Sequence, residues 1–305
     1  MLTSPSTSSP DTGSPDASSP DTSSPDTSGT EHPWIQRARA AGRPLVFAHR
    51  GGAKIGPENT LAAFERAHAL GVDGFELDVR LSRDGEVVVI HDADVDRTTN
   101  GSGKVSAMTA AELRTLDAGF RFKDSPVEGD TRIPLLRDIL ARFPEEMLII
   151  ELKGASPALP PRAFEIVREA GALDRVCFGG FQRHMLIGVR RCGRRVTSDH
   201  PDRPVVCSSA SREETRWSLY RSWVRMPWPW RPYDAFQVPE ISKKTRVVSP
   251  EFVRAAHARG LLVQVWTVNE EPQMQRLLSW GVDGLISDRP DLALRVRDAF
   301  ASAPR

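Results

Sequence analysis

Hydrophobic and charged residues alternate between positions 75 and 79, and this two-residue period predicts a strand. The apolar positions are Phe75, Leu77 and Val79, and the charged positions are Glu76 and Asp78. Successive side chains of a strand point to opposite faces. We therefore expect the two carboxylates to lie side by side, with the apolar side chains packed on the other face.

A second strand is predicted over residues 87–90, which are apolar, largely β-branched and followed by His91. The tight-turn signal Asp84-Gly85 separates the two strands. If this turn closes a hairpin centred between its two residues, Asp78 lies opposite His91. If the second strand instead pairs in parallel, His91 still ends a strand beside the two carboxylates. Both arrangements deliver an imidazole to a pair of acids.

Apolar strands alternate with helices along most of the chain, which predicts an α/β protein with parallel pairing. Nine candidate strands lie at residues 44–48, 75–79, 87–90, 147–153, 175–178, near Val196, and at 234–238, 261–269 and 282–288. We predict a (β/α)8 TIM barrel with one extra strand in the hairpin and a small insertion after the third strand. A doubly wound open sheet is the alternative, but the glycine-rich turn expected after its first strand is missing.

The chain divides into a predicted disordered tail, residues 1–32, and a predicted barrel domain, residues 33–305. Residues 9–28 hold four copies of a five-residue Ser-Pro-Asp unit, which contain no large apolar residue to bury. Residues from about 92 to 132 break the strand–helix rhythm and are predicted to form an insertion over one end of the barrel. Thr109 and Glu112 form a capping-box pattern that predicts a short helix within it.

Composition and charge exclude several functional classes. The formal net charge is +1 and the arginines are scattered, so a nucleic-acid partner is not expected. The three cysteines have no metal-binding spacing, and their odd number favours a reducing compartment. Neither a signal peptide nor a run of ~18 apolar residues is present, so we expect a soluble cytoplasmic protein. The sequence contains no motif typical of hydrolases that use a catalytic serine, a catalytic cysteine or a zinc ion.

Polar side chains occur at the predicted carboxyl ends of the strands, where a TIM barrel builds its active site. They are His49, Glu76, Asp78, His91, Glu151, Lys153, Asn269 and Asp288. Three crowded carboxylates repel each other unless a cation holds them, and an all-oxygen set favours Mg²⁺ or Ca²⁺. The competing interpretation pairs each carboxylate with a nearby arginine or lysine.

The two histidines at strand ends, His49 and His91, suit phosphoryl chemistry. Arg50 and Lys153 lie close to them in the pattern and, together with a cation, would neutralise a phosphate. The histidines would then exchange protons with the reacting oxygens.

These motifs, in this order and spacing, resemble the glycerophosphodiester phosphodiesterase family. The motifs are His49-Arg50-Gly51-Gly52, Pro57-Glu58-Asn59-Thr60, Glu76-Leu-Asp78, Asp84-Gly85, His91-Asp92, Arg97-Thr-Thr, Glu151-Leu-Lys153, Trp266-Thr-Val-Asn269 and residues 281–288. The resemblance implies a TIM barrel that hydrolyses a glycerophosphodiester to sn-glycerol 3-phosphate and an alcohol.

The resemblance also implies roles for individual residues. It implies a divalent cation, Ca²⁺ or Mg²⁺, on Glu76, Asp78 and Glu151, acid–base catalysis by His49 and His91, phosphate binding by Arg50 and Lys153, and supporting roles for Glu58 and Trp266. Glu58 would orient the first histidine or the metal shell. We assign His91 as the base and His49 as the acid, and the reverse assignment stays open.

Residues 216–232 are rich in tryptophan and arginine, and the family pattern does not account for them. The favoured interpretation is a crossover that packs its aromatic side chains on the outer wall of the barrel. The alternative is a surface at Trp217–Trp230 that meets lipid tails or an anionic membrane. The substrate would then be a lysophospholipid and the enzyme a lysophospholipase D. A non-catalytic phosphodiester-binding barrel is a third alternative, although such a relative would be expected to have lost a histidine or a ligand.

Overall fold

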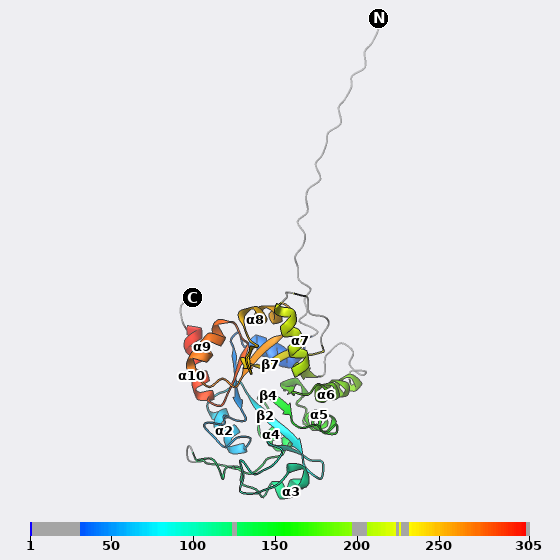
Figure 1. The fold of residues 1–305 in the computed structure, drawn as a ribbon, viewed down its shortest axis with the longest axis vertical. Helices are drawn as coiled ribbons and strands as arrows, with labels where there is room; N and C mark the ends of the chain where they lie inside the picture. The colour runs from blue at the N-terminus through cyan, green and yellow to red at the C-terminus, as the bar shows by residue number, and fades with distance from the viewer. Residues whose placement is uncertain (2–30, 124–126, 197–205, 224–225, 227–231, 303–305) are drawn as a thin grey trace.

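Eight parallel strands form a nearly closed barrel in the computed structural model, which describes residues 1, 31–123, 127–196, 206–223, 226 and 232–302 (Figure 1). The barrel strands are β1 (Leu45–His49), β2 (Gly74–Leu81), β4 (Met147–Leu152), β5 (Val176–Gly179), β6 (Cys207–Ser208), β7 (Ala235–Pro239), β10 (Leu262–Trp266) and β11 (Gly284–Ser287). They are hydrogen-bonded in the order β6-β5-β4-β2-β1-β11-β10-β7. A parallel bridge from Ser209 to Ala235 joins the two ends of this series. The predicted TIM barrel is confirmed.

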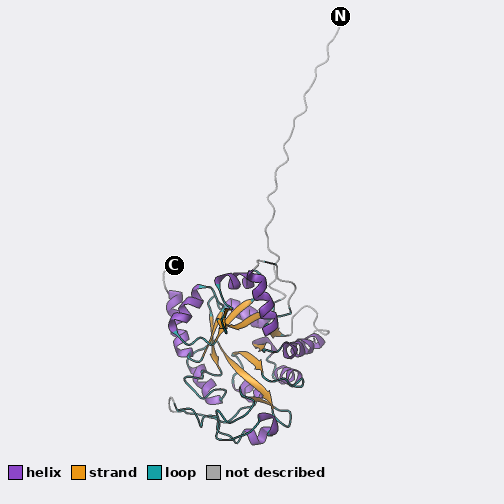
Figure 2. Ribbon diagram, in the orientation of Figure 1, coloured by secondary structure: helices purple, strands orange, loops and turns teal. Residues whose placement is uncertain are grey.

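Helices follow the strands and cover the outside of the barrel (Figure 2). They are α2 (Leu61–Ala69), α4 (Leu136–Arg142), α5 (Leu159–Glu169), α6 (Arg183–Val196), α7 (Arg212–Trp223), α8 (Pro250–His257), α9 (Glu271–Ser279) and α10 (Pro290–Ser302). A further helix, α1 (Pro33–Ala40), precedes the first strand and packs Trp34 against inward-facing strand residues such as Phe47. No described helix is long and apolar enough to span a lipid bilayer.

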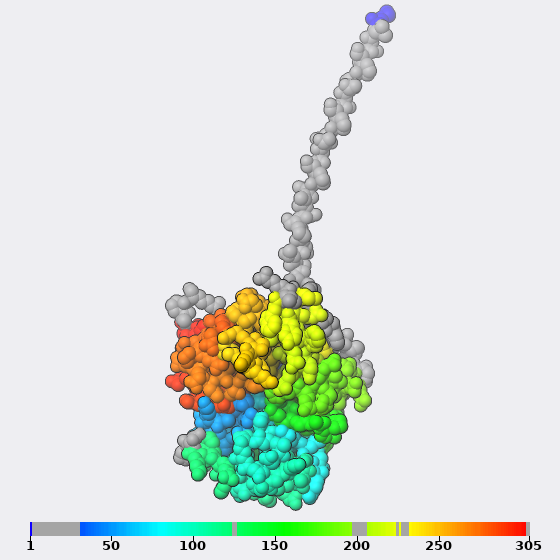
Figure 3. Space-filling model, in the orientation of Figure 1, coloured from blue at the N-terminus to red at the C-terminus, as the bar shows by residue number. Residues whose placement is uncertain are grey.

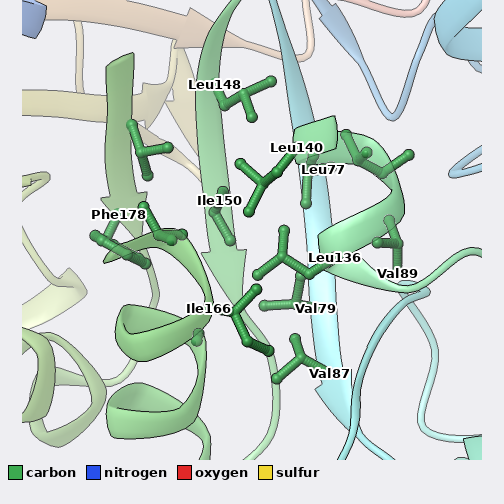
Figure 4. Packing of buried hydrophobic residues seen from close by; sticks show 14 of the residues in the cluster. Leu77, Val79, Val87, Val89, Leu136, Leu140, Leu148, Ile150, Ile166 and Phe178 are labelled. Carbon is green, nitrogen blue, oxygen red and sulfur yellow. The ribbon is translucent and has the colours of Figure 1, made fainter. Parts of the chain in front are cut away.

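Much of the apolar core lies between the strands and the helices around them. Leu77 and Val79 of β2 and Leu148 and Ile150 of β4 point toward the helices and are fully buried (Figure 4). They pack there against residues of α4 and α5. The alternation predicted for β2 is therefore confirmed, because its even-numbered carboxylates point to the other face.

The predicted hairpin forms, but its register differs by one residue from the expected one. Strand β3 (Val87–Val89) pairs with β2 in antiparallel orientation, and the Ile90 N–H donates to the Asp78 carbonyl at 2.9 Å. Asp78 is thus opposite Ile90, and the expectation that it faces His91 is wrong. Gly85 adopts φ +80°, a conformation that lets the turn hold an odd number of residues and moves the pairing by one.

The strand expected near Val196 is also wrong, because Val196 is the last residue of α6. The barrel strand in this part of the chain is β6, which has only two residues. A strand of that length has no detectable hydrophobic period. Between the end of α6 and this strand, residues 197–205 lie outside the described part of the chain.

The segment after β3 folds as an irregular insertion around its own small core. It contains η1 (Val105–Ala107) and α3 (Ala110–Leu113), and the predicted capping box between Thr109 and Glu112 is present. In Figure 1, the insertion lies at the end of the barrel toward which β2 points. The remaining elements are η2 (Leu173–Arg175) and a small hairpin of β8 (Ile241–Ser242) and β9 (Thr245–Arg246).

Residues 1–32 are predicted to be a disordered tail, and residues 2–30 of this segment lie outside the described part of the chain. The division into a tail and a barrel domain therefore stays a prediction.

Candidate active site

The candidate site begins where β1 ends, at His49, and the next residue turns back over β2. Arg50 has φ 54°, and Gly51 and Gly52 have φ 84° and 93°. The Arg50 N–H lies 2.8 Å from the Glu76 carbonyl and 3.1 Å from Glu76 Oε2. A Cβ at Gly51 would lie 2.8 Å from the Ala63 Cβ. Glycine is therefore needed there both for the left-handed backbone and for the close approach of α2.

Three carboxylates converge inside this end of the barrel. Glu76 and Asp78 point inward from β2, and Glu151 lies on β4 in register with Asp78. One oxygen of each lies within 4.8 Å of one oxygen of the others. Asp78 is completely buried and Glu76 is nearly so. The strand period and the register therefore build the predicted acidic cluster.

Two cations compensate part of this negative charge. Lys153 Nζ lies 3.1 Å from Asp78 Oδ1 and 2.9 Å from Glu151 Oε1, and Arg50 Nε lies 3.2 Å from Asp78 Oδ2. Burial alone would raise the pKa of Asp78, but Lys153 and Arg50 outweigh it and hold the pKa below its usual range. Asp78 and Glu151 therefore pair directly with basic residues, as the competing interpretation of the sequence expected.

Glu76 is not compensated in this way. Among the described residues its ion-pair partner is His49, whose Nε2 lies 3.8 Å from Glu76 Oε2. Complete desolvation, reinforced by the neighbouring Asp78 carboxylate, raises the pKa of Glu76 to about 8. Burial likewise raises the pKa of Glu151, although Lys153 opposes the shift. If all three were ionised, they would carry more negative charge than Lys153 and Arg50 neutralise.

The cluster fits a hard divalent cation. Asp78 Oδ1 and Glu151 Oε1 are buried and lack a hydrogen bond of good geometry, despite the nearby ammonium. Carboxylate oxygens are the ligands that Mg²⁺ and Ca²⁺ prefer. A cation in contact with the three carboxylates would remove the repulsion between them.

His49 is held between two carboxylates. Its Nδ1 lies 2.6 Å from Asp288 Oδ1, and Asn269 fixes Asp288 by donating from Nδ2 to Oδ2 at 2.8 Å. Burial lowers the pKa of His49, but the Glu76 charge and the hydrogen bond to Asp288 outweigh it, so the pKa is raised. With Nδ1 bonded to Asp288, Nε2 is the nitrogen turned toward the acidic cluster.

His91 has the opposite electrostatic balance. Its Nδ1 lies 2.7 Å from Asp92 Oδ1, and Asp92 in turn pairs with Arg97. Burial lowers the pKa of His91, and the Asp78 and Asp92 carboxylates do not fully offset it. The two histidines therefore have pKa values shifted in opposite directions.

Glu58 links the insertion to the barrel, and Asn59 contacts the acidic cluster. Glu58 accepts from Arg50 at 3.0 Å and from Arg97 at 2.6 and 2.8 Å. Asn59, at φ 60°, donates from Nδ2 to Asp78 Oδ2 at 3.0 Å. Glu58 thus fixes the guanidinium of Arg50 rather than a histidine.

An aromatic wall borders the ammonium of Lys153. The Nζ atom is 5.4 Å from the centre of the Phe181 ring, and Trp266 meets the same ring edge-on at 5.6 Å. Trp266 comes from the end of β10, so this predicted residue also faces the site.

The structure therefore brings the predicted residues to one end of the barrel, on β1, β2, β4 and β10 and in the segments that follow β1, β3 and β4. Several residues that contact them were not selected as site residues from the sequence, among them Asn59, Asp92, Arg97, Phe181 and Asp288. Asp288 was recognisable as a polar residue at a strand end, but its contact with His49 depends on the neighbouring position of β1 and β11.

The three aromatic side chains of α7 do not pack on the barrel wall as expected. Trp217 is 67% exposed, Tyr220 47% and Trp223 59%. Helix α7 instead buries Ser218 and Leu219. The packing interpretation is therefore wrong for these three residues, and Trp228 and Trp230 lie outside the described chain.

A family model described as the glycerophosphoryl diester phosphodiesterase family matches residues 49–292. The chain belongs to this family. It is 32% identical over 261 residues to a glycerophosphodiester phosphodiesterase from Caldanaerobacter subterraneus subsp. tengcongensis, covering 83% of this chain and 98% of that protein. It is 29% identical to a lysophospholipase D from Rattus norvegicus, covering 80% of this chain and 83% of that protein.

A solved structure supports the same assignment. The crystal structure of a glycerophosphodiester phosphodiesterase from Agrobacterium tumefaciens str. C58 superposes with a TM-score of 0.63 at 28% identity, over 83% of this chain and 99% of that chain. The resemblance noted from the sequence motifs is confirmed, and the chain is a phosphodiesterase of this family.

Proposed function

We propose that this phosphodiesterase hydrolyses glycerophosphodiesters to sn-glycerol 3-phosphate and a free alcohol, with a divalent cation and two histidines. The proposal is supported most directly by three carboxylates and two histidines that lie together at one end of the barrel. The pKa of one histidine is raised and that of the other is lowered. The names of the curated relatives support the substrate class.

Glu76, Asp78 and Glu151 would hold the cation, Mg²⁺ or Ca²⁺. When bound, such an ion supplies positive charge that stabilises the phosphate as negative charge develops on it. Arg50 and Lys153 would bind the phosphate oxygens from the protein side. Asp78 pairs with both basic groups and so keeps them oriented toward the cluster.

His49 is proposed as the general acid and His91 as the general base. The raised pKa of His49 favours its protonated form, and the lowered pKa of His91 favours the neutral form. His91 would take a proton from the attacking oxygen, and His49 would give one to the leaving alcohol oxygen as the P–O bond breaks. Asp288 and Asp92 would position the two rings through Nδ1.

The metal part of the proposal is tested by chelation and by a ligand variant. We expect release of glycerol 3-phosphate from glycerophosphocholine to stop in excess chelator and to return on addition of Ca²⁺ or Mg²⁺. Glu76→Gln should lose both this activity and the cation-dependent rise in thermal midpoint, while its circular dichroism spectrum stays native. Full turnover in excess chelator would refute the cation requirement.

The histidine assignment is tested with two leaving groups. His49→Ala and His91→Ala should each lower turnover by on the order of 10²–10⁴-fold, as expected for loss of acid–base catalysis. His257→Ala, a histidine outside the site, is the matched control and should keep near-normal turnover. With a p-nitrophenyl ester, whose leaving group needs no proton, His49→Ala should recover more activity than His91→Ala. The reverse pattern would exchange the two roles.

A second candidate function is lysophospholipase D activity, and it is supported by the curated relative of that name and by the exposed aromatic residues of α7. Rates with glycerophosphocholine and lysophosphatidylcholine distinguish the two substrate classes. The non-catalytic phosphodiester-binding barrel considered from the sequence is not kept as a candidate, because the chain belongs to a family of phosphodiesterases.

A further inference from the structure

The solvent face of α7 carries three large aromatic side chains in mutual contact. The ring centres of Trp217 and Tyr220 lie 6.5 Å apart, and those of Tyr220 and Trp223 lie 5.4 Å apart. All three residues are exposed, as is Met226 just after the helix, at 52%. Contiguous exposed apolar groups of this kind indicate a surface that another body covers. We call Trp217, Tyr220 and Trp223 the aromatic face.

Helix α6, the neighbour of α7 in the outer ring, adds a strong positive charge beside this face (Figure 1). Residues 183–196 contain five arginines and no acidic residue, in a chain whose formal net charge is only +1. Four of these arginines are exposed: Arg183, Arg191, Arg194 and Arg195. On α7, Arg216 adds another exposed positive charge next to Trp217.

We propose that the aromatic face and the exposed arginines of α6 bind the surface of an anionic lipid bilayer. Tryptophan and tyrosine favour the boundary between lipid headgroups and acyl chains, and arginines are attracted to anionic headgroups. A second copy of this chain is a poorer occupant, because a symmetric dimer through this face would bring two basic helices together. In Figure 3, α7 (yellow) forms part of the outer surface and is open to contact.

The position of α7 places the bilayer beside the entrance of the candidate site. At the start of the helix, the Arg212 N–H donates to the Phe181 carbonyl at 3.1 Å, and its guanidinium lies 5.1 Å from the Phe181 ring centre. The same ring contacts Lys153 and Trp266. A cavity of about 440 Å³ lies here between the beginnings of α6 and α7. At 1.5 Å per residue, Trp217 lies only ~7 Å along the helix from this rim.

Binding to vesicles tests the membrane proposal without any measurement of turnover. A negative result would therefore count against membrane binding and not against the proposed hydrolysis. Wild-type protein should co-sediment with vesicles of equal parts phosphatidylcholine and phosphatidylserine, and less with pure phosphatidylcholine. Added salt should weaken the binding, because it screens the arginines. Vesicles that contain brominated acyl chains should quench the tryptophan fluorescence.

Two surface variants separate the aromatic and the charged contributions. Trp217→Ala with Trp223→Ala should lower vesicle affinity at least tenfold and remove the quenching. Arg191→Gln with Arg194→Gln should lower affinity by about fivefold per arginine and reduce the salt dependence. Both pairs of side chains are exposed, so the thermal midpoint should be unchanged. The matched control is Phe300→Ala with Arg295→Gln on α10, which should bind like wild type.

Four results would overturn the proposal. Wild-type protein could fail to bind the anionic vesicles, or both surface variants could bind as tightly as the control. Alternatively, light scattering could show a dimer that Trp217→Ala with Trp223→Ala dissociates, which would assign the face to a second copy of the chain. Retention of a protein partner by wild type, with no vesicle binding, would assign it to that partner instead.

Discussion

Replacement of Asp288 by asparagine tests whether a single hydrogen bond sets the state of His49. Asp288 Oδ1 lies 2.6 Å from His49 Nδ1, and Oδ2 accepts from Asn269 Nδ2 at 2.8 Å. Asn269 cannot turn over to help, because its Oδ1 accepts from the Asp288 N–H at 2.9 Å and from the Ser287 hydroxyl. The Asp288 carboxylate accepts a hydrogen bond on each oxygen, one from His49 and one from Asn269. An asparagine at this position has only one oxygen, so its NH₂ group must face one of these two donors.

Either orientation of the new amide loses one hydrogen bond, to Asn269 in the first case and to a protonated His49 Nδ1 in the second. If its NH₂ faces Asn269, two donors oppose each other. If its NH₂ faces His49, it donates to Nδ1, so Nδ1 cannot carry a proton and the ring is held in its neutral form, which is a much weaker acid than the imidazolium. A charge-assisted hydrogen bond is worth about 1.5–3 kcal/mol, which corresponds to roughly 10–150-fold in rate. The same Asp→Asn change beside the histidine of a Ser-His-Asp triad costs about 10⁴-fold, which sets the upper end of the expected loss.

The assay is steady-state release of glycerol 3-phosphate as a function of pH. We expect kcat to fall by about 10–10⁴-fold, with KM nearly unchanged, because the lost interaction acts mainly in the transition state. Asp288 contributes to the raised pKa of His49, so its neutralisation should lower that pKa. An acid must stay protonated, so the alkaline limb of the pH–rate profile should move to lower pH.

A double variant provides the decisive control. In a His49→Ala background, Asp288→Asn should have almost no further effect, because the two residues act as one unit. If Asp288→Asn lowers the rate by the same factor with and without His49, then Asp288 acts by another route and the positioning argument is wrong. An unchanged rate in the single variant would have the same consequence.

Three predictions concern stability. The hydrogen bond to Asp283 raises the pKa of His257. This pair should therefore stabilise the fold below about pH 6.5 and lose the effect as pH rises. We expect the urea midpoint of His257→Ala to approach that of wild type at alkaline pH. Arg190 and Glu214 form a buried ion pair at 2.8 Å, so Arg190→Met should cost about 3–5 kcal/mol of unfolding free energy, and Glu214→Gln in addition should restore part of it. Leu148→Ala should cost about 2–5 kcal/mol in the same measurement, because Leu148 is completely buried in the core.

The barrel and much of its site were predictable because they depend on short periods in the sequence. The alternation around Glu76 and Asp78 fixes which side chains point inward, and the parallel register then brings Glu151 alongside. Strand ends also locate His49 and Lys153. The chemistry of the cluster follows from residue types that the pattern already contains.

The remaining features depend on contacts between distant parts of the chain. The hairpin register depends on the backbone at Gly85, and the two-residue strand β6 is fixed by its neighbours rather than by its own sequence. The role of Asp288 needs the pairing of β1 with β11. The exposure of Trp217 and Trp223 depends on which face of α7 meets the barrel, and that helix has little amphipathic pattern from which to predict it.

The short helix before the first strand limits how far the chain can be trimmed. Trp34 is fully buried and stacks on Phe47 with ring centres 6.0 Å apart, at the opposite end of the barrel from the catalytic groups. Arg39 ties the helix to the Gly260 carbonyl at 2.9 Å. A chain that began at residue 49, where the match to the family model begins, would lack α1 and nearly all of β1. We expect water to enter the barrel at the end that Trp34 covers. Expression designs for crystallisation should therefore start no later than residue 31, even though the match to the family model begins at residue 49.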